Sequence, residues 1–185
     1  MIFRPGKLEE MAPVSTRIRM RYVLAGIGSG VAGAMFVLLF LMLGCLWYRR
    51  SIWIPANLFS TAVYGSDAYT NHFVSTSWVG LAIVVVMYGV MGAAWGVVWR
   101  DQRPRFPLLY GAICGAITYF LLFGFFWKRV DPFLSLYSPD RQLEFANVIW
   151  GMIVARSPLL AARMRTETVP TQEEAVEVRS GEVIL

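Results

Sequence analysis

Residues 22–48, YVLAGIGSGVAGAMFVLLFLMLGCLWY, decide the fold, because these 27 residues include no charged side chain. At about 1.5 Å of rise per residue, a helix of this length exceeds the roughly 30 Å hydrocarbon core of a bilayer. We therefore expect it to cross a membrane with some tilt. The composition agrees, because the 185-residue chain is 57% hydrophobic and 16% charged, whereas about 25% of the residues of soluble domains are charged.

Two further stretches have the same character. Residues 73–99 are uncharged and end at Arg100, and residues 106–127 have Pro107 at a position suited to the first turn of a helix. Both are long enough and apolar enough to span a bilayer.

The fourth stretch, 143–162, contains Glu144 and Arg156. Both charges lie near its ends, where long side chains can reach the interface, so we predict a full crossing. A half-buried re-entrant helix is the alternative. The sequence thus predicts an all-α fold, a polytopic membrane bundle of four transmembrane helices over 22–162. A basic N-terminal segment at 1–21 precedes it, and an acidic tail at 163–185 follows.

The basic residues lie in short clusters beside the hydrophobic stretches, where they act as topology signals rather than as nucleic-acid contacts. With the N-terminus inside, eleven of them face the cytoplasm: Arg4, Lys7, Arg17, Arg19, Arg21, Arg100, Arg103, Arg105, Arg163, Arg165 and Arg179. Five face the other side: Arg49, Arg50, Lys128, Arg129 and Arg141. Since Lys and Arg are in excess in cytoplasmic loops, we predict a multi-pass membrane protein with both termini cytoplasmic.

Residues 51–65, SIWIPANLFSTAVYG, are apolar but too short to cross the membrane. Trp53 is an amphipathic aromatic of the kind favoured at the interface, so we expect a short interfacial helix here. One interpretation is a helix that plugs the mouth of the bundle. The other is a docking surface for a neighbouring protein at Trp53, Leu58 and Phe59, in which Leu58, Phe59 and Ala62 form one apolar face.

Small residues recur every fourth position in the first three spans. Such spacing lets helix backbones approach closely in lipid, where hydrophobicity does not drive helices together. We therefore predict helix contacts at six glycines: Gly26, Gly30, Gly92, Gly96, Gly111 and Gly115. Asn147 and Tyr119 are expected to form hydrogen bonds between helices, in a structural role.

Most catalytic and transport chemistry within a bilayer needs ionisable groups there, and the first three stretches contain none. No residue pattern supports nucleophilic catalysis, acid–base catalysis or a metal site, so we predict a protein that is not an enzyme. His72 is the single histidine, and one axial bond to a haem or chlorophyll is the most it could provide. The sequence requires no cofactor, and a bound lipid or pigment is compatible with it.

The segment "SIWIPANL" follows the first span, and "VDPFL" precedes the final "FANVIWG". In this order they resemble uncharacterised four-helix membrane proteins of bacteria that carry a W-x-P-x-N-L element. The resemblance covers residues 22–162. It implies four spans in a bacterial inner membrane and assigns no functional residue.

We weigh three functions. The lack of catalytic groups and the packing glycines favour a non-catalytic accessory subunit of a larger membrane complex, such as an electron-transfer assembly. Its partners would be lipids and other membrane subunits, held in part by the acidic tail, whose alternating pattern suits strand addition to a partner. A small homo-oligomeric transporter or channel is the alternative, and a membrane enzyme is the third.

Overall fold

The computed structural model describes residues 7–99 and 106–166, and these residues form helices and connecting loops without a strand. Four helical segments are long and apolar enough to cross a membrane: Met20–Trp47, Ser77–Val98, Pro107–Val130 and Asp140–Ala162. The predicted all-α bundle of four membrane helices is confirmed. The acidic tail beyond residue 166, and with it the predicted strand addition, lies outside the described residues.

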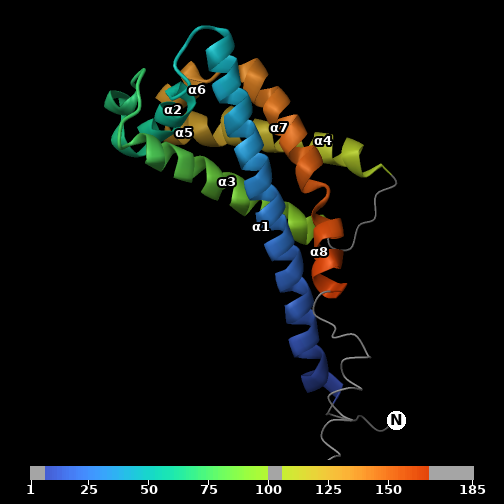
Figure 1. Ribbon diagram of the computed structural model, residues 1–185. Coiled ribbons are helices and arrows are strands. Elements are labelled where there is room, and N and C mark those ends of the chain that lie inside the picture. Colours follow the sequence, from blue (N-terminus) through green and yellow to red (C-terminus); the bar gives the residue numbers. More distant parts are fainter. Residues whose placement is uncertain (1–6, 100–105, 167–185) are drawn as a thin grey trace, which may run out of the picture.

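The elements follow one another along the chain in the order shown in Figure 1. They are α1 (Lys7–Trp47), α2 (Ile54–Tyr64), the 3-10 turn η1 (Ser66–Ala68), α3 (Ser77–Val98), α4 (Pro107–Tyr119), the π-helical η3 (Phe120–Phe126), α5 (Trp127–Val130), α6 (Pro132–Tyr137), α7 (Asp140–Val154) and α8 (Ser157–Thr166).

Two boundaries differ from the predicted ones. The second span begins at Ser77 instead of residue 73, because residues 69–76 form a loop tied to α2. The fourth span consists of α7 and α8, with a break between Val154 and Ser157. Pro158 explains the break, since proline has no N–H to continue the hydrogen bonds of α7. The two helices still follow one another along the length of the bundle (Figure 1).

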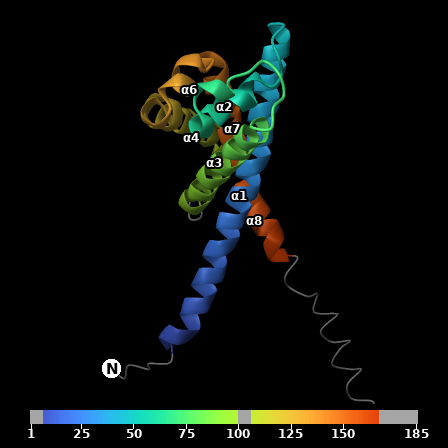
Figure 2. The same cartoon turned by 90° about the vertical axis from the view of Figure 1, so that its left-hand side faces the viewer.

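The long helix α1 runs the length of the molecule, and other spans pack against it (Figures 1 and 2). Helix α3 packs along α1, α4 packs along α7, and α1 also packs against α7 and α8. By contrast, α3 and α4 are neighbours in sequence but make few backbone contacts, and a hydrogen bond of 3.0 Å from Nε1 of Trp95 on α3 to the hydroxyl oxygen of Thr118 on α4 links them. The helix backbones therefore pack in a row, α3–α1–α7–α4, whose two ends are joined by side chains.

Glycines form the contact between α1 and α3. A Cβ atom added at Gly30 would lie 3.0 Å from the Cα atom of Gly92, and one added at Gly96 would lie 3.0 Å from the Cα atom of Gly26. These neighbours are backbone atoms, which cannot rotate away. The two helices approach this closely only because both surfaces lack side chains.

A second glycine contact joins α4 to α7. A Cβ atom at Gly111 would lie 2.7 Å from the carbonyl oxygen of Gly151, and one at Gly151 would lie 2.7 Å from the Cα atom of Gly115. Each of the six glycines predicted at helix contacts thus lies against the backbone of a neighbouring helix. Gly151, which has no glycine four residues away, was missed.

A buried polar group joins the two helix pairs. The hydroxyl of Tyr88 on α3 donates a hydrogen bond of 3.1 Å to Oδ1 of Asn147 on α7. Next to it, Nε1 of Trp150 donates to the carbonyl oxygen of Gly30, 3.2 Å away. All three side chains are fully buried. In an apolar surrounding such bonds favour one alignment of the helices, because an unpaired polar group would be costly.

Helix α2 packs inside the loop end of the bundle, and residues 55–61 are buried there. Leu58 is 4% exposed and Phe59 is 1% exposed. The Phe59 ring lies 6.1 Å from that of Trp127 and 6.3 Å from that of Phe123. The docking surface predicted from Leu58 and Phe59 is therefore wrong, because this chain itself covers that face.

Candidate functional site

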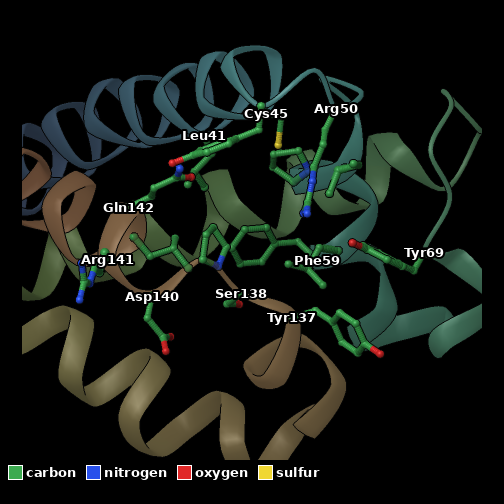
Figure 3. A pocket seen from close by; sticks show the side chains of 16 residues that line it. Leu41, Cys45, Arg50, Phe59, Tyr69, Tyr137, Ser138, Asp140, Arg141 and Gln142 are labelled. Atoms are coloured by element: carbon green, nitrogen blue, oxygen red, sulfur yellow. The ribbon is translucent and has the colours of Figure 1, made fainter.

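A cavity of about 450 Å³ opens at the loop end of the bundle, between the end of α1, the start of α2 and the link from α6 to α7 (Figure 3). Its floor is apolar and formed by Leu41, Leu58, Phe59 and Leu143, all buried. Its rim is polar. This combination of an apolar floor and polar groups at one end is typical of small-molecule sites, which measure about 300–1,000 Å³.

Buried hydrogen bonds hold α2, one wall of this cavity. Asn57 donates to the carbonyl oxygens of Thr70 and His72, at 2.8 and 2.9 Å, and accepts from the Ser77 hydroxyl at 2.6 Å. This arrangement ties the loop before α3 to the side of α2. The asparagine of the W-x-P-x-N-L element therefore has a structural role.

A second polar contact fixes the far side of α2. The hydroxyl of Thr61 donates a hydrogen bond of 2.6 Å to Oδ2 of Asp131, whose Oδ1 accepts from the backbone N–H of Leu134 at 3.2 Å. Asp131 thereby caps α6. One buried carboxylate thus joins α2 to α6, and the wall is held from both sides.

The end of α1 places an arginine at the rim. Arg49 has φ +55°, in the left-handed region. The N–H of Arg49 donates to the carbonyl oxygen of Leu46 at 3.0 Å, and that of Arg50 donates to the carbonyl oxygen of Cys45 at 2.8 Å. This is a Schellman motif, in which glycine usually takes the left-handed position. The chain turns sharply there, and the Arg50 side chain points into the cavity (Figure 3).

The remaining polar side chains of the rim differ in direction. The hydroxyl of Tyr69 points toward the cavity, whereas the carboxylate of Asp140 points away from Arg50 (Figure 3). Asp140 accepts a hydrogen bond of 3.4 Å from the hydroxyl of Tyr119 on α4. Within the described residues, neither Arg50 nor Arg141 has an ion-pair partner. The rim therefore presents positive charge.

A second hollow is a groove of about 780 Å³ on the membrane-facing flank, between α3 and the η3 segment. Its walls include Ile83, Met87 and Met91 from α3 and Leu122 and Phe126 from η3. At its end lies Trp127, which is 3% exposed and whose indole N–H has no hydrogen-bond partner within the described residues.

The other residues predicted as sites lie outside both hollows. His72 is exposed on the loop before α3, where its carbonyl group holds Asn57, and its side chain lines neither hollow. Trp53 is half-buried, with its ring 4.7 Å from that of Phe73, so it stiffens the loop end.

The described residues contain no group of three or more His, Cys, Asp or Glu that could hold a metal ion. Sequence reasoning missed the cavity itself and counted Arg50 only as a topology signal. The doubled arginine at the end of a long span was the available clue. Searches against protein families, curated proteins and solved structures find no match for this chain.

Proposed function

We propose that the protein is a non-catalytic subunit of a larger membrane complex, and that the groove between α3 and η3 receives a transmembrane helix of a partner protein. The observation that carries this proposal is the groove between α3 and η3, along which the backbones of these two segments do not pack against each other.

The surface of α3 along the groove has the form that a second helix needs. Two adjacent rows of side chains, each with a spacing of four residues, line it: Trp78, Ala82, Val86 and Val90, and Val79, Ile83, Met87 and Met91. Rows of this kind form the ridges and grooves into which another helix packs. From Trp78 to Met91 they run about 20 Å, more than half of a hydrocarbon core of roughly 30 Å.

One feature of the opposite wall supports a partner. The wall belongs to the π-helical segment Phe120–Phe126, and π-helical turns occur frequently at functional sites. Met87 and Met91 are adaptable side chains, common at binding surfaces.

The orientation belongs to the same proposal. The start of α1 and the end of α8 lie at one end of the bundle, opposite α2 and α6 (Figure 1). We place the former end in the cytoplasm of a bacterial cell because of the eleven-to-five distribution of basic residues.

Photo-crosslinking in native membranes tests the partner helix. A benzophenone amino acid at Val86 or Val90, both exposed in the groove, should give one discrete adduct, and peptide mapping should place the bond in a transmembrane helix of a second protein. The same probe at Leu39, exposed on α1 and outside the groove, should react with lipid.

A matched pair of variants controls for nonspecific capture. Ala82→Phe would fill the groove and should abolish the adduct from Val86, whereas Ala32→Phe, at an exposed alanine of α1, should leave it unchanged. Lipid adducts alone at both groove positions would overturn the proposal. An adduct between two copies of this chain would instead favour the homo-oligomeric transporter or channel.

A further inference from the structure

The cavity at the loop end extends from the depth of the lipid headgroups into the apolar part of the bilayer. Trp47 and Tyr48, the last residues of the first span, are exposed aromatic side chains of the kind that mark the interface. Leu41, on the cavity floor, lies about 10 Å deeper along α1. A molecule that fills this cavity must therefore be polar at one end and apolar at the other.

The polar end selects a negative charge. Arg50 points into the cavity and has no acidic partner within the described residues. Arg141 also belongs to the lining, and the carboxylate of Asp140 is turned toward α4. Arginine binds phosphate with two parallel hydrogen bonds, and the hydroxyl of Tyr69 is a further donor facing the same space.

The backbone at Arg49 supports a functional position for Arg50. A left-handed conformation costs a residue with a side chain about 1–2 kcal/mol, and glycine would avoid that cost. Strain of this kind is concentrated at functional sites, where a particular direction of the chain is needed. Here the left-handed turn directs the next side chain into the cavity.

We propose that this cavity is a binding site for an anionic phospholipid in the leaflet at the loop end. The phosphate lies against Arg50 and Tyr69, and the upper part of one acyl chain lies on Leu41, Leu58 and Phe59. A volume of about 450 Å³ suits this part of a lipid. A zwitterionic lipid would bring a positive group close to Arg50, so a lipid with net negative charge is preferred. This site is independent of the partner helix proposed for the groove.

Native mass spectrometry of the purified full chain tests the inference. The protein is incubated with equal amounts of phosphatidylglycerol and phosphatidylcholine, and bound lipid is counted. The wild type should retain phosphatidylglycerol preferentially. Arg50→Gln should weaken its binding about tenfold or more, because a hydrogen-bonded charge pair is lost.

Two further variants keep the test specific. Arg49→Gln removes one positive charge from the adjacent position, and its side chain does not line the cavity, so binding should stay close to that of the wild type. Cys45→Phe fills the cavity from α1 and should prevent binding without changing the charge. Equal losses in Arg49→Gln and Arg50→Gln, or a wild type without preference between the two lipids, would overturn the inference. The adduct from Val86 should persist in Arg50→Gln, which separates this test from that of the partner helix.

Discussion

Gly92→Ala should destabilise the protein, although alanine is the better helix former. The new Cβ atom would lie 2.7 Å from the Cα atom of Gly30 and 3.0 Å from its N atom. Ordinary contact begins at 3.4 Å, and the carbonyl oxygen of Gly26 lies nearer still, so α1 and α3 must part by at least about 0.7 Å. A gap of about 0.5–1 Å forfeits a quarter to a half of the dispersion energy of each contact along the helices, and overpacking typically costs about 1–3 kcal/mol.

Gly28→Ala is the matched control on α1. A Cβ atom at Gly28 meets nothing within 4 Å, so the helix propensity of alanine should stabilise this variant by about 1 kcal/mol. The two variants make the same chemical change, so the gain in helix propensity cancels and their stabilities should differ by the cost of overpacking, about 1–3 kcal/mol. At about 2–4 °C per kcal/mol, their melting temperatures should differ by roughly 2–12 °C.

Tryptophan fluorescence during heating in mild detergent measures this difference, since the chain contains seven tryptophans. Because the variants differ from the wild type by one methyl group each, their detergent binding should be alike. A Gly92→Ala protein as stable as Gly28→Ala would refute the reasoning. It would mean that α1 and α3 do not meet at this glycine.

Three other outcomes are expected. Tyr88→Phe should lower the free energy of unfolding by about 1–3 kcal/mol in a detergent melt, because Asn147 loses its buried donor. The same substitution should lower it by less in an Asn147→Ala background, and an equal loss in both backgrounds would contradict the hydrogen bond. Arg49→Gly should raise the melting temperature by relieving about 1 kcal/mol of strain, whereas Arg49→Ala should not; no gain would argue against the left-handed turn. Cysteines at Ser66 and Thr171 should show opposite accessibility to an impermeant reagent in sealed cells, and labelling of both from outside would exclude the proposed orientation.

The number and class of the helices could be predicted from the sequence, because a span is defined by the length of an uncharged stretch. The six glycines could be located for a similar reason, since a small side chain every fourth residue forms a smooth stripe on a helix. Their partners could not be predicted. Gly26 and Gly30 meet Gly92 and Gly96, whereas Gly111 and Gly115 meet Asn147 and Gly151 on the fourth span.

Asn147 shows the same limit for polar residues. Its hydrogen bond to another helix was expected from an amide inside an apolar stretch. The donor, Tyr88, lies 59 residues away in sequence, and only the packing of α3 and α7 on α1 brings the two together.

The sequence by itself determined that the chain belongs in a membrane, where its four spans lie, and which side chains are small enough for close contact, because hydrophobicity, length and size are properties of each segment alone. The tertiary structure decided which surfaces are covered. The helix at 54–64 looks like a surface for partners, yet Leu58 and Phe59 are buried because Thr61 meets Asp131, 70 residues away in sequence, and the rings of the third span close over them. The cavity at Arg50 arises likewise, from a left-handed turn that no local preference of arginine predicts and from walls that three distant segments bring together. The sequence pattern limits which contacts a side chain can make, and the fold determines which of these contacts it makes.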